Sequence, residues 1–387
     1  MTVLKIPESD LLEMGALHTA KEIASQPSLW KQTAAKFFEQ SAAMHLFLKT
    51  AYLESDNIIL TGAGTSAFIG LSLEGSFFAS THKISRAVAT TDIVSHPHHY
   101  FGPNSVPLLI SFARSGKSPE SVAALELADR FCKKCFHLII TCNDEGALAR
   151  YESKNPVRVF VLPPDSNDKS LAMTGSYTSM LLAGLLVAWI ERKDFCKQQI
   201  QLVSDAAEKI LREETETIRE IAGRDFQRAV FLGSGALFGT ATEAALKLQE
   251  LTDGQIICKA DTYLGFRHGP KAVIDETTLV VYFFNNNSYV QQYESDLLQG
   301  MKTGNPAMFQ LGIGERQLSL QELQAYIHFN ENNATVAEDF LPVCSILAGQ
   351  LLGFYKSLQL GLMPDAPSVS GSISRVVQGV NIYPVEQ

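Results

Sequence analysis

The sequence predicts an α/β protein of two tandem, related domains, each a parallel sheet flanked by helices. The chain has 387 residues, whereas a single hydrophobic core rarely grows beyond about 250–300 residues. Short apolar strands alternate with helical stretches, which is typical of a parallel sheet with helices on both faces. A strand leading into Gly-x-Gly occurs twice, at Gly62–Gly64 and Gly233–Gly235, an offset of 171 residues. The offset predicts a duplicated scaffold.

The first half is expected to begin with helices and continue as strands. Asp10–Ala24 and Trp30–Leu53 repeat apolar residues at three- and four-residue spacing, with Pro27 and Ser28 between them. Ser118, Pro119 and Glu120 form a typical helix start, with a cap, a proline and an acid at the positive end. Four short apolar runs are predicted to be strands: Asn57–Leu60, Val106–Phe112, Phe136–Thr141 and Val157–Leu162.

The second half repeats the pattern. A charged helix is predicted over Asp205–Arg224, a strand from Ala229 into the second Gly-x-Gly turn, and another strand at Leu279–Phe284. We therefore expect an N-terminal helical segment in residues 1–44, a first domain in 45–200, a second domain in 210–365, and an irregular tail in 366–387 that contributes to the site. The Glu/Lys/Gln-rich region 194–215 is expected to connect the domains as a helix.

Composition narrows the class of partner. The net charge is −9 and the pI about 5.5, and no Lys/Arg block occurs, so nucleic acid is not an expected partner. The N-terminus lacks the pattern of a signal peptide, and the apolar stretch Tyr177–Ile190 is shorter than the roughly 20 residues of a membrane span. We expect a cytoplasmic protein without a membrane partner and a buried helix at Tyr177–Ile190. The six cysteines are expected to be reduced and without a structural role, although Cys132 and Cys135 form one CxxC motif, which also occurs in redox and zinc sites.

The glycine turns favour an anionic ligand. In an open parallel sheet, ligands bind at the carboxyl ends of the strands, where glycines allow close approach and helix N-termini attract anions. The first turn offers Gly64, Thr65 and Ser66, and the turn after the next predicted strand runs from Arg114 through Ser115, Gly116 and Lys117 to Ser118. Hydroxyls and local positive charge suit one phosphate monoester, although Gly/Ser turns are also ordinary turn chemistry.

Two rival ligands fit the sequence less well. A dinucleotide site would need GxGxxG and an acid about 20 residues on, and neither follows Gly62. His96, His98 and His99 could bind a metal, but they lie in a predicted loop without a carboxylate at helical spacing. We expect neither a cofactor nor a metal.

The second half carries acid–base residues. Glu243, Lys247 and Glu250 share one face of a predicted helix that starts at the second Gly-x-Gly turn, near the ligand end of the sheet. A solvated, salt-bridged stripe is the usual alternative for such spacing. His268 precedes Gly269 and Pro270, and a histidine in a rigid loop can exchange protons near neutral pH.

Together these motifs resemble the sugar isomerase (SIS) domain family over about residues 45–380, which implies two flavodoxin-like three-layer sandwiches. The runs Ser111–Ser121 and Gly265–Lys271 are most similar to galactosamine-6-phosphate deaminase/isomerases, also called tagatose-6-phosphate ketose/aldose isomerases. The isomerase half of glucosamine-6-phosphate synthase is a more distant relative. By motif, the resemblance implies that Glu250 moves a proton between C1 and C2, that His268 opens the sugar ring, and that the first-domain loops bind phosphate.

The sequence departs from the synthase at two places. Ser374-Arg375-Val376 stands where the synthase has a catalytic lysine, and Arg375 can stabilise an oxyanion but does not readily form a Schiff base. Ala113-Arg114 replaces Ser-Gln, and this arginine would strengthen charge pairing with phosphate. No amidotransferase domain is present to supply ammonia, so deamination is the expected direction.

The expected function is the deaminating isomerisation of a 2-amino-2-deoxyhexose 6-phosphate, with D-galactosamine 6-phosphate giving D-tagatose 6-phosphate and ammonia. Glu250, His268, Lys247, Glu243 and Arg375 are the expected catalytic residues. Simple aldose–ketose isomerisation needs the same residues and stays open, as does a regulator that binds sugar phosphate without chemistry. The resemblance also implies a homodimer or larger homo-oligomer in which the His268 loop reaches a neighbour's site.

Overall fold

The computed structural model describes residues 1–318, 320–331, 333–377 and 379–385, which group into two compact units. The unit that we call the N-sheet unit comprises residues 29–167, 175–197 and 374–387. The C-sheet unit comprises residues 1–28, 168–174 and 198–373. The chain therefore passes between the units more than once, and its first helices join the unit that is built mainly from the C-terminal half.

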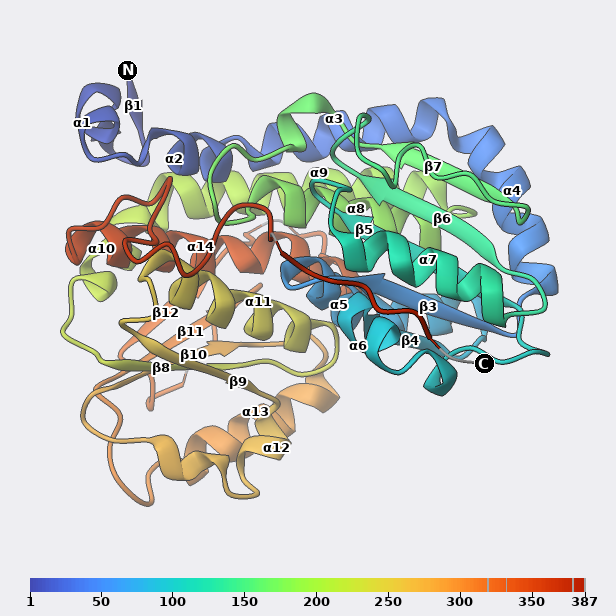
Figure 1. Cartoon of the computed structure of the whole chain (residues 1–387). Helices are drawn as coiled ribbons and strands as arrows, with labels where there is room; N and C mark the ends of the chain where they lie inside the picture. The colour runs from blue at the N-terminus through green and yellow to red at the C-terminus, as the bar shows by residue number, and fades with distance from the viewer. Residues whose placement is uncertain (319, 332, 378, 386–387) are drawn as a thin grey trace. The chain divides into compact units, whose positions relative to one another are not determined.

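The N-sheet unit contains a parallel five-stranded sheet in the order β4-β3-β5-β6-β7 (Figure 1). The connection after β3 leads to β4 on one side of the sheet, and the connection after β5 leads to β6 on the other side. The switch point therefore lies between the carboxyl ends of β3 and β5. The strands are β3 (Asn57–Gly62), β4 (Ser85–Ala89), β5 (Pro107–Ala113), β6 (Phe136–Thr141) and β7 (Val157–Val161).

Helix α8 (Gly175–Ala188) is the core helix of this unit, and every one of its residues is buried. The prediction of a buried helix at this apolar stretch is confirmed. Thr178 on α8 accepts a hydrogen bond of 2.9 Å from the Trp30 indole. The other helices are α3 (Gln26–Glu39), most of which belongs to this unit, α4 (Ser41–Glu54), α5 (Thr65–Thr81), α6 (Thr90–Ser95) and α7 (Pro119–Phe131).

The C-sheet unit has the same strand order, since its parallel sheet runs β12-β11-β10-β8-β9. The predicted duplication and fold class are therefore confirmed. The switch point of this sheet lies between β8 and β10. The strands are β8 (Arg228–Leu232), β9 (Ile257–Asp261), β10 (Thr278–Phe283), β11 (Phe309–Gly314) and β12 (Ala325–His328), and a separate antiparallel pair joins β1 (Thr2–Val3) to β2 (Ile6–Pro7).

The helices of the C-sheet unit form a layer on each face of its sheet. Helices α11 (Ala236–Leu251) and α14 (Leu341–Gln359) pack together on one face, and α12 (Tyr263–Phe266) and α13 (Ser288–Gly300) on the other (Figure 1). The segment Glu338–Gln359 is long and apolar enough to cross a membrane, but 94% of its most apolar 18-residue stretch is buried inside the protein, as in a core helix. The remaining helices are α1 (Glu8–Glu13), α2 (Leu17–Ala24), α9 (Lys193–Lys209), which begins in the other unit, and α10 (Thr215–Ala222).

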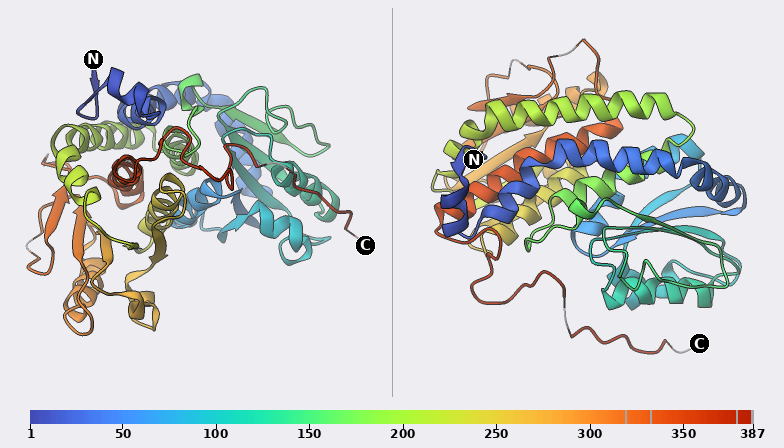
Figure 2. Two further views of the ribbon diagram at one scale, coloured as in Figure 1. Left: turned by 60° about the vertical axis from the view of Figure 1, so that its left-hand side comes forward. Right: turned by 90° about the horizontal axis from the view of Figure 1, so that it is seen from above.

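Several predicted boundaries need correction. The helix expected over Asp10–Ala24 is broken at Gly15, which has a positive φ of 59°. Pro27 lies in the first turn of α3 instead of between helices, because proline at that position loses no helical hydrogen bond. The region 194–215 is helical, as predicted, and the described residues after α14 form no helix or strand (Figure 2).

A partly buried carboxylate ties together one end of the N-sheet unit. Asp129 of α7 accepts hydrogen bonds from Tyr151, Ser153 and Asn155 at 2.6–2.7 Å, and His137 Nε2 lies 2.8 Å from its Oδ1. Burial by itself would raise the pKa of Asp129, but the hydrogen bonds, with His137 first, hold this pKa well below its usual range.

The depressed pKa of Asp129 makes this unit sensitive to acid. A carboxylate with a lowered folded pKa stabilises the protein above its unfolded pKa, and this stabilisation is lost as the pH falls. Asp129→Asn is therefore expected to lower stability at pH 7 and to reduce the stability lost between about pH 5 and pH 3. Urea unfolding across this range tests it, with Asp144→Asn at an exposed aspartate as control. Parallel pH profiles for Asp129→Asn and wild type would contradict the assignment.

Candidate active site

The turn after β3 forms an open cradle in the N-sheet unit. Gly64 caps α5 with a positive φ of 55°, and a Cβ built on it meets no atom of the described residues within 4 Å. At Gly62 a Cβ would lie 2.6 Å from Ser66, so only glycine fits there. Thr65 and Ser66 open helix α5 and are 4% and 5% exposed. The turn therefore presents backbone N–H groups and hydroxyls at a helix N-terminus.

The turn after β5 lies beside it, at the same switch point. Gly116 has a positive φ of 60°, and the Asn143 side chain donates 2.8 Å to the Ser115 carbonyl, which holds the turn in place. Ser118 precedes α7, as predicted, but its hydroxyl donates to Glu120 at 2.9 Å. The structure thus brings both predicted phosphate turns to adjacent strand ends.

Arg114 has a contact that the sequence did not predict. It is 7% exposed, and its Nη2 donates 2.6 Å to the main-chain carbonyl of Arg375 in the C-terminal tail. The Arg375 guanidinium donates 2.8 Å to Asn167 Oδ1. The contact of Asn167 could not be predicted from the sequence, because an asparagine after a serine is common in turns. Arg114 thereby joins the turn after β5 to the tail and places Arg375 beside it.

This contact predicts a role for Arg114 in ordering the tail. Arg114→Met removes the donor to Arg375, so the tail around residues 374–377 is expected to exchange amide hydrogens faster and to be cut sooner by protease. Lys117→Met, at an exposed lysine of the same turn, is the matched control and should leave both rates unchanged. Equal tail protection in the two variants would contradict the role.

The acid–base residues of α11 are buried, so the alternative of a solvated surface stripe is wrong. The side chains of Glu243 and Lys247 are fully buried, and Glu250 is 22% exposed. Lys247 Nζ lies 2.5 Å from Glu250 Oε2 and 3.4 Å from Glu243 Oε1. A buried lysine between two carboxylates can fix the position of Glu250, the member of the three that reaches solvent.

Glu250 does not lie near the Gly-x-Gly turn that precedes its helix. Helix α11 starts just after Gly235 and runs back along the sheet, and a rise of 1.5 Å per residue puts Glu250 about 22 Å along the helix. We expected the face of α11 that carries Glu250 to lie near the carboxyl ends of the strands of its own sheet. Only the start of the helix lies there. A ligand that touches Glu250 is not held by Gly233–Gly235.

The described residues of one chain show no contact between His268 and the α11 residues. His268 is exposed and follows α12, which packs on the opposite face of the sheet from α11. Its loop is ordered by Thr262, whose hydroxyl accepts 3.0 Å from the Gly265 amide, and by the positive φ of 119° at Gly269. The loop is well formed, and the His268 side chain makes no hydrogen bond or ion pair with the described residues of its own chain.

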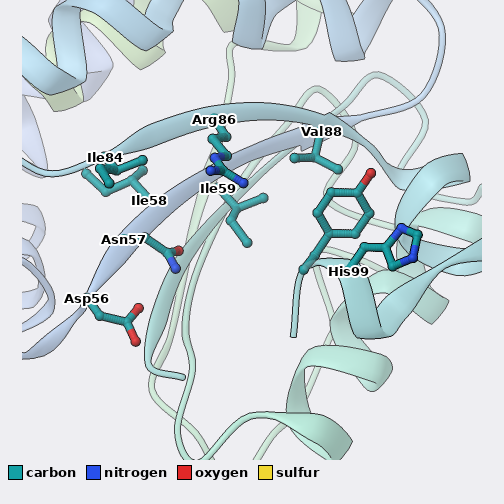
Figure 3. Close-up of a pocket in the computed structure, with 9 residues that line it drawn as sticks. Asp56, Asn57, Ile58, Ile59, Ile84, Arg86, Val88 and His99 are labelled. Atoms are coloured by element: carbon teal, nitrogen blue, oxygen red, sulfur yellow. The ribbon is translucent and has the colours of Figure 1, made fainter. Parts of the chain in front are cut away.

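Other features of the N-sheet unit lie outside the predicted site. A cavity of about 330 Å³ extends from Asp56, which precedes β3, along β4 to His99 (Figure 3). None of the predicted site residues lines it. The rings of His96 and His99 stack at 5.0 Å, and within the described residues no group of three or more His, Cys, Asp or Glu side chains could hold a metal ion.

Comparison with known proteins gives consistent matches. Residues 51–189 match the SIS domain model. D-galactosamine-6-phosphate deaminase AgaS of Shewanella sp. (strain ANA-3) is 39% identical over 386 residues, 98% of this chain and 95% of that protein. Glutamine–fructose-6-phosphate aminotransferase of Clostridium tetani is a more distant match, 24% identical over 365 residues, 90% of this chain and 57% of that protein.

Solved structures agree with the sequence matches. A crystal structure from Clostridium novyi NT is 40% identical, with a TM-score of 0.96 and full coverage of both chains. The crystal structure of tagatose-6-phosphate ketose/aldose isomerase from Escherichia coli is 35% identical, with a TM-score of 0.86 over 95% of this chain and 97% of that one.

Proposed function

Because the chain belongs to the family of D-galactosamine-6-phosphate deaminases, we propose that it converts D-galactosamine 6-phosphate and water to D-tagatose 6-phosphate and ammonia. The observation that carries the proposal is the buried ion cluster of α11, in which Lys247 holds the partly exposed carboxylate of Glu250. A carboxylate fixed in this way suits proton transfer at a carbon next to a carbonyl group. We also propose that the enzyme acts in the cytoplasm and needs neither cofactor nor metal.

The phosphate end of the sugar is assigned to the open cradle of the N-sheet unit. Gly64, Thr65 and Ser66 supply N–H and hydroxyl donors at a helix N-terminus, and Ser115, Gly116 and Ser118 flank them from the next strand. Arg114 contributes charge and also carries the tail contact. Arg375, beside this turn, would stabilise negative charge that develops on the sugar.

The reaction begins with ring opening, in which His268 moves the proton between the ring oxygen and the C1 hydroxyl. Glu250 then removes the C2 proton, which the C1 aldehyde acidifies, and delivers it to C1. The electron pair shifts, and one N–H proton of the amine passes to the C1 oxygen, so that C1 becomes an alcohol and C2 an imine. Water adds to the imine carbon, the C2–N bond breaks, and ammonia leaves to give the 2-keto sugar phosphate. Lys247 and Arg375 offset the charge of the enediol-like state, and Glu243 balances the charge of Lys247.

The exposed position of His268 supports a site shared between subunits of a homo-oligomer. If one subunit supplies His268 and another Glu250, mixed dimers of His268→Gln and Glu250→Gln contain one intact site. Random mixing of the two inactive variants is then expected to restore about a quarter of wild-type activity. Native mass spectrometry, with one variant isotopically labelled, confirms that the mixture has exchanged subunits. An exchanged mixture that remains inactive would place both residues in the same chain's site.

Simple isomerisation of a hexose 6-phosphate is the second candidate, supported by the likeness to the tagatose-6-phosphate ketose/aldose isomerase structure. Galactosamine 6-phosphate and glucosamine 6-phosphate are incubated in turn with the enzyme, and free ammonia is measured. Deamination predicts ammonia from the galacto compound. If neither amino sugar releases ammonia but galactose 6-phosphate is converted to tagatose 6-phosphate, the enzyme is an isomerase.

A further inference from the structure

The duplicated sheet carries a second cradle with the same backbone as the first. Gly235 caps α11 with φ 57° and ψ −130°, and Gly64 caps α5 with φ 55° and ψ −128°. At Gly233 a Cβ would lie 2.2 Å from the Leu237 carbonyl oxygen, so this turn is as tight as the one at Gly62. Both turns follow the first strand of their sheet, at the switch point. On backbone geometry alone, the second cradle suits an anion as well as the first does.

The second cradle holds a carboxylate of its own chain. A Cβ built on Gly235 would meet Glu338 Oε1 at 4.0 Å, whereas a Cβ on Gly64 meets no atom of the described residues within that distance. The same Glu338 oxygen accepts 2.8 Å from Asn285 Nδ2, which follows β10. Glu338 therefore lies between the turns after β8 and β10, where a ligand at this switch point would bind.

The surrounding charges have the opposite sign to those in the first cradle. After β5 the chain supplies Arg114 and Lys117, but after β10 it supplies Asn285, Asn286 and Asn287. Acidic side chains accept hydrogen bonds from these asparagines. Glu294 accepts a hydrogen bond of 3.1 Å from the main-chain amide of Asn285, and Glu315 accepts one of 2.6 Å from Asn286 Nδ2. Burial, with the charge of Glu338 as a further contribution, raises the pKa of Glu294 to about 8.

We propose that Glu338 is a built-in anion that occupies the second cradle and confines sugar phosphate to the first. The side-chain amides of Asn285 and Asn287 donate to the Glu338 carboxylate at 2.8 and 3.3 Å, and the positive end of α11 beside it favours a negative charge there, as it would favour a bound phosphate. Its negative charge, together with that of Glu315, opposes entry of an external phosphate. The duplicated scaffold would then have one substrate site per chain, and Glu338 would determine which half holds it. This inference rests on the proposed function in one respect, which is that the ligand of the first cradle is a sugar phosphate.

Chemical rescue tests the proposal in the full-length protein. Glu338→Ala removes the carboxylate and leaves its donors unpaired, so Tm is expected to fall by about 4 °C. Excess formate, a carboxylate small enough for the vacated position, should restore at least half of the loss, and neutral formamide should not. Wild type and Glu338→Gln, whose side chain still fills the cradle, should show no selective response to formate. If Glu338→Ala does not fold, its refolding yield in formate against formamide gives the same readout.

Equal effects of formate and formamide on Glu338→Ala, or an equal formate response in the wild type, would overturn the proposal. A second experiment measures, by calorimetric titration of the wild type, how many inorganic phosphate ions bind to each chain. One phosphate per chain, lost in Ser66→Ala, is expected, and binding of two would also overturn the proposal. If no phosphate binds but formate rescues Glu338→Ala, the built-in anion stands and the phosphate assignment of the first cradle fails.

Discussion

Glu250→Gln is expected to lower kcat for deamination by about 10³-fold, within the usual range for loss of a general acid–base group. Glutamine has nearly the same shape and can still accept the hydrogen bond that Lys247 now donates to Glu250 at 2.5 Å. It cannot accept the C2 proton. The loss should therefore fall on kcat, with little change in the Kd for inorganic phosphate, because the proposed phosphate donors belong to other turns.

The control for Glu250→Gln is Gln249→Ala, which changes the neighbouring exposed side chain on the same turn of α11. It should retain kcat within about twofold, since surface substitutions usually have small effects. Steady-state kinetics with coupled detection of ammonia measures both variants. Near-wild-type kcat in Glu250→Gln would rule out Glu250 as the base. Loss of phosphate binding in this variant would instead indicate a structural role.

Lys247→Met is expected to destabilise the protein by about 3–5 kcal/mol, the range observed when one partner of a buried ion pair is removed. Lys247 and Glu243 are fully buried 3.4 Å apart, so the substitution leaves the Glu243 carboxylate without its cation in the core. Urea unfolding monitored by circular dichroism measures the loss. Lys259→Met, at a lysine that is 41% exposed and paired with Asp261, is the matched control and should change stability by no more than about 0.5 kcal/mol.

The double variant Glu243→Gln/Lys247→Met separates the ion pair from the packing. With both charges removed, at least half of the lost stability should return, because no uncompensated charge remains buried. Activity should not return, since Lys247 also fixes Glu250. A double variant as unstable as Lys247→Met alone would show that the aliphatic packing of Lys247, and not its charge, carries the stability.

The central strands were predictable because burial on both faces gives them continuous apolar runs. Residues Phe136–Thr141 are all buried, and the observed strand β6 has the predicted bounds. The edge strand β4, with the sequence Ser-Arg-Ala-Val-Ala, has only Val88 buried and was missed, as were the edge strands β9 and β12. The internal strand β11 (Phe309–Gly314) was also missed, because Gln310 and two glycines interrupt its apolar run. The Gly-x-Gly turns were also predictable, since their positive φ and tight approach to the helix admit only glycine.

The site was only partly predictable, because its remaining features depend on contacts far apart in the sequence. Nothing local to Arg114 indicates a hydrogen bond to Arg375, 261 residues away. The spacing of Glu243 and Lys247 also fits an exposed helix face, and only the packing of α11 against α14 shows that these charges are buried. Likewise, Glu338 is an ordinary acid in sequence, and the fold alone brings it to the turn at Gly235.

Following the C2 hydrogen through the reaction tests the central claim most directly. The enzyme is incubated with galactosamine 6-phosphate deuterated at C2, and the products are analysed by mass spectrometry and NMR together with an ammonia assay. Proton transfer by Glu250 predicts ammonia and tagatose 6-phosphate in equal amounts, with part of the deuterium at C1 of the ketose. A sugar phosphate that keeps its deuterium at C2 and its amino group would contradict the account.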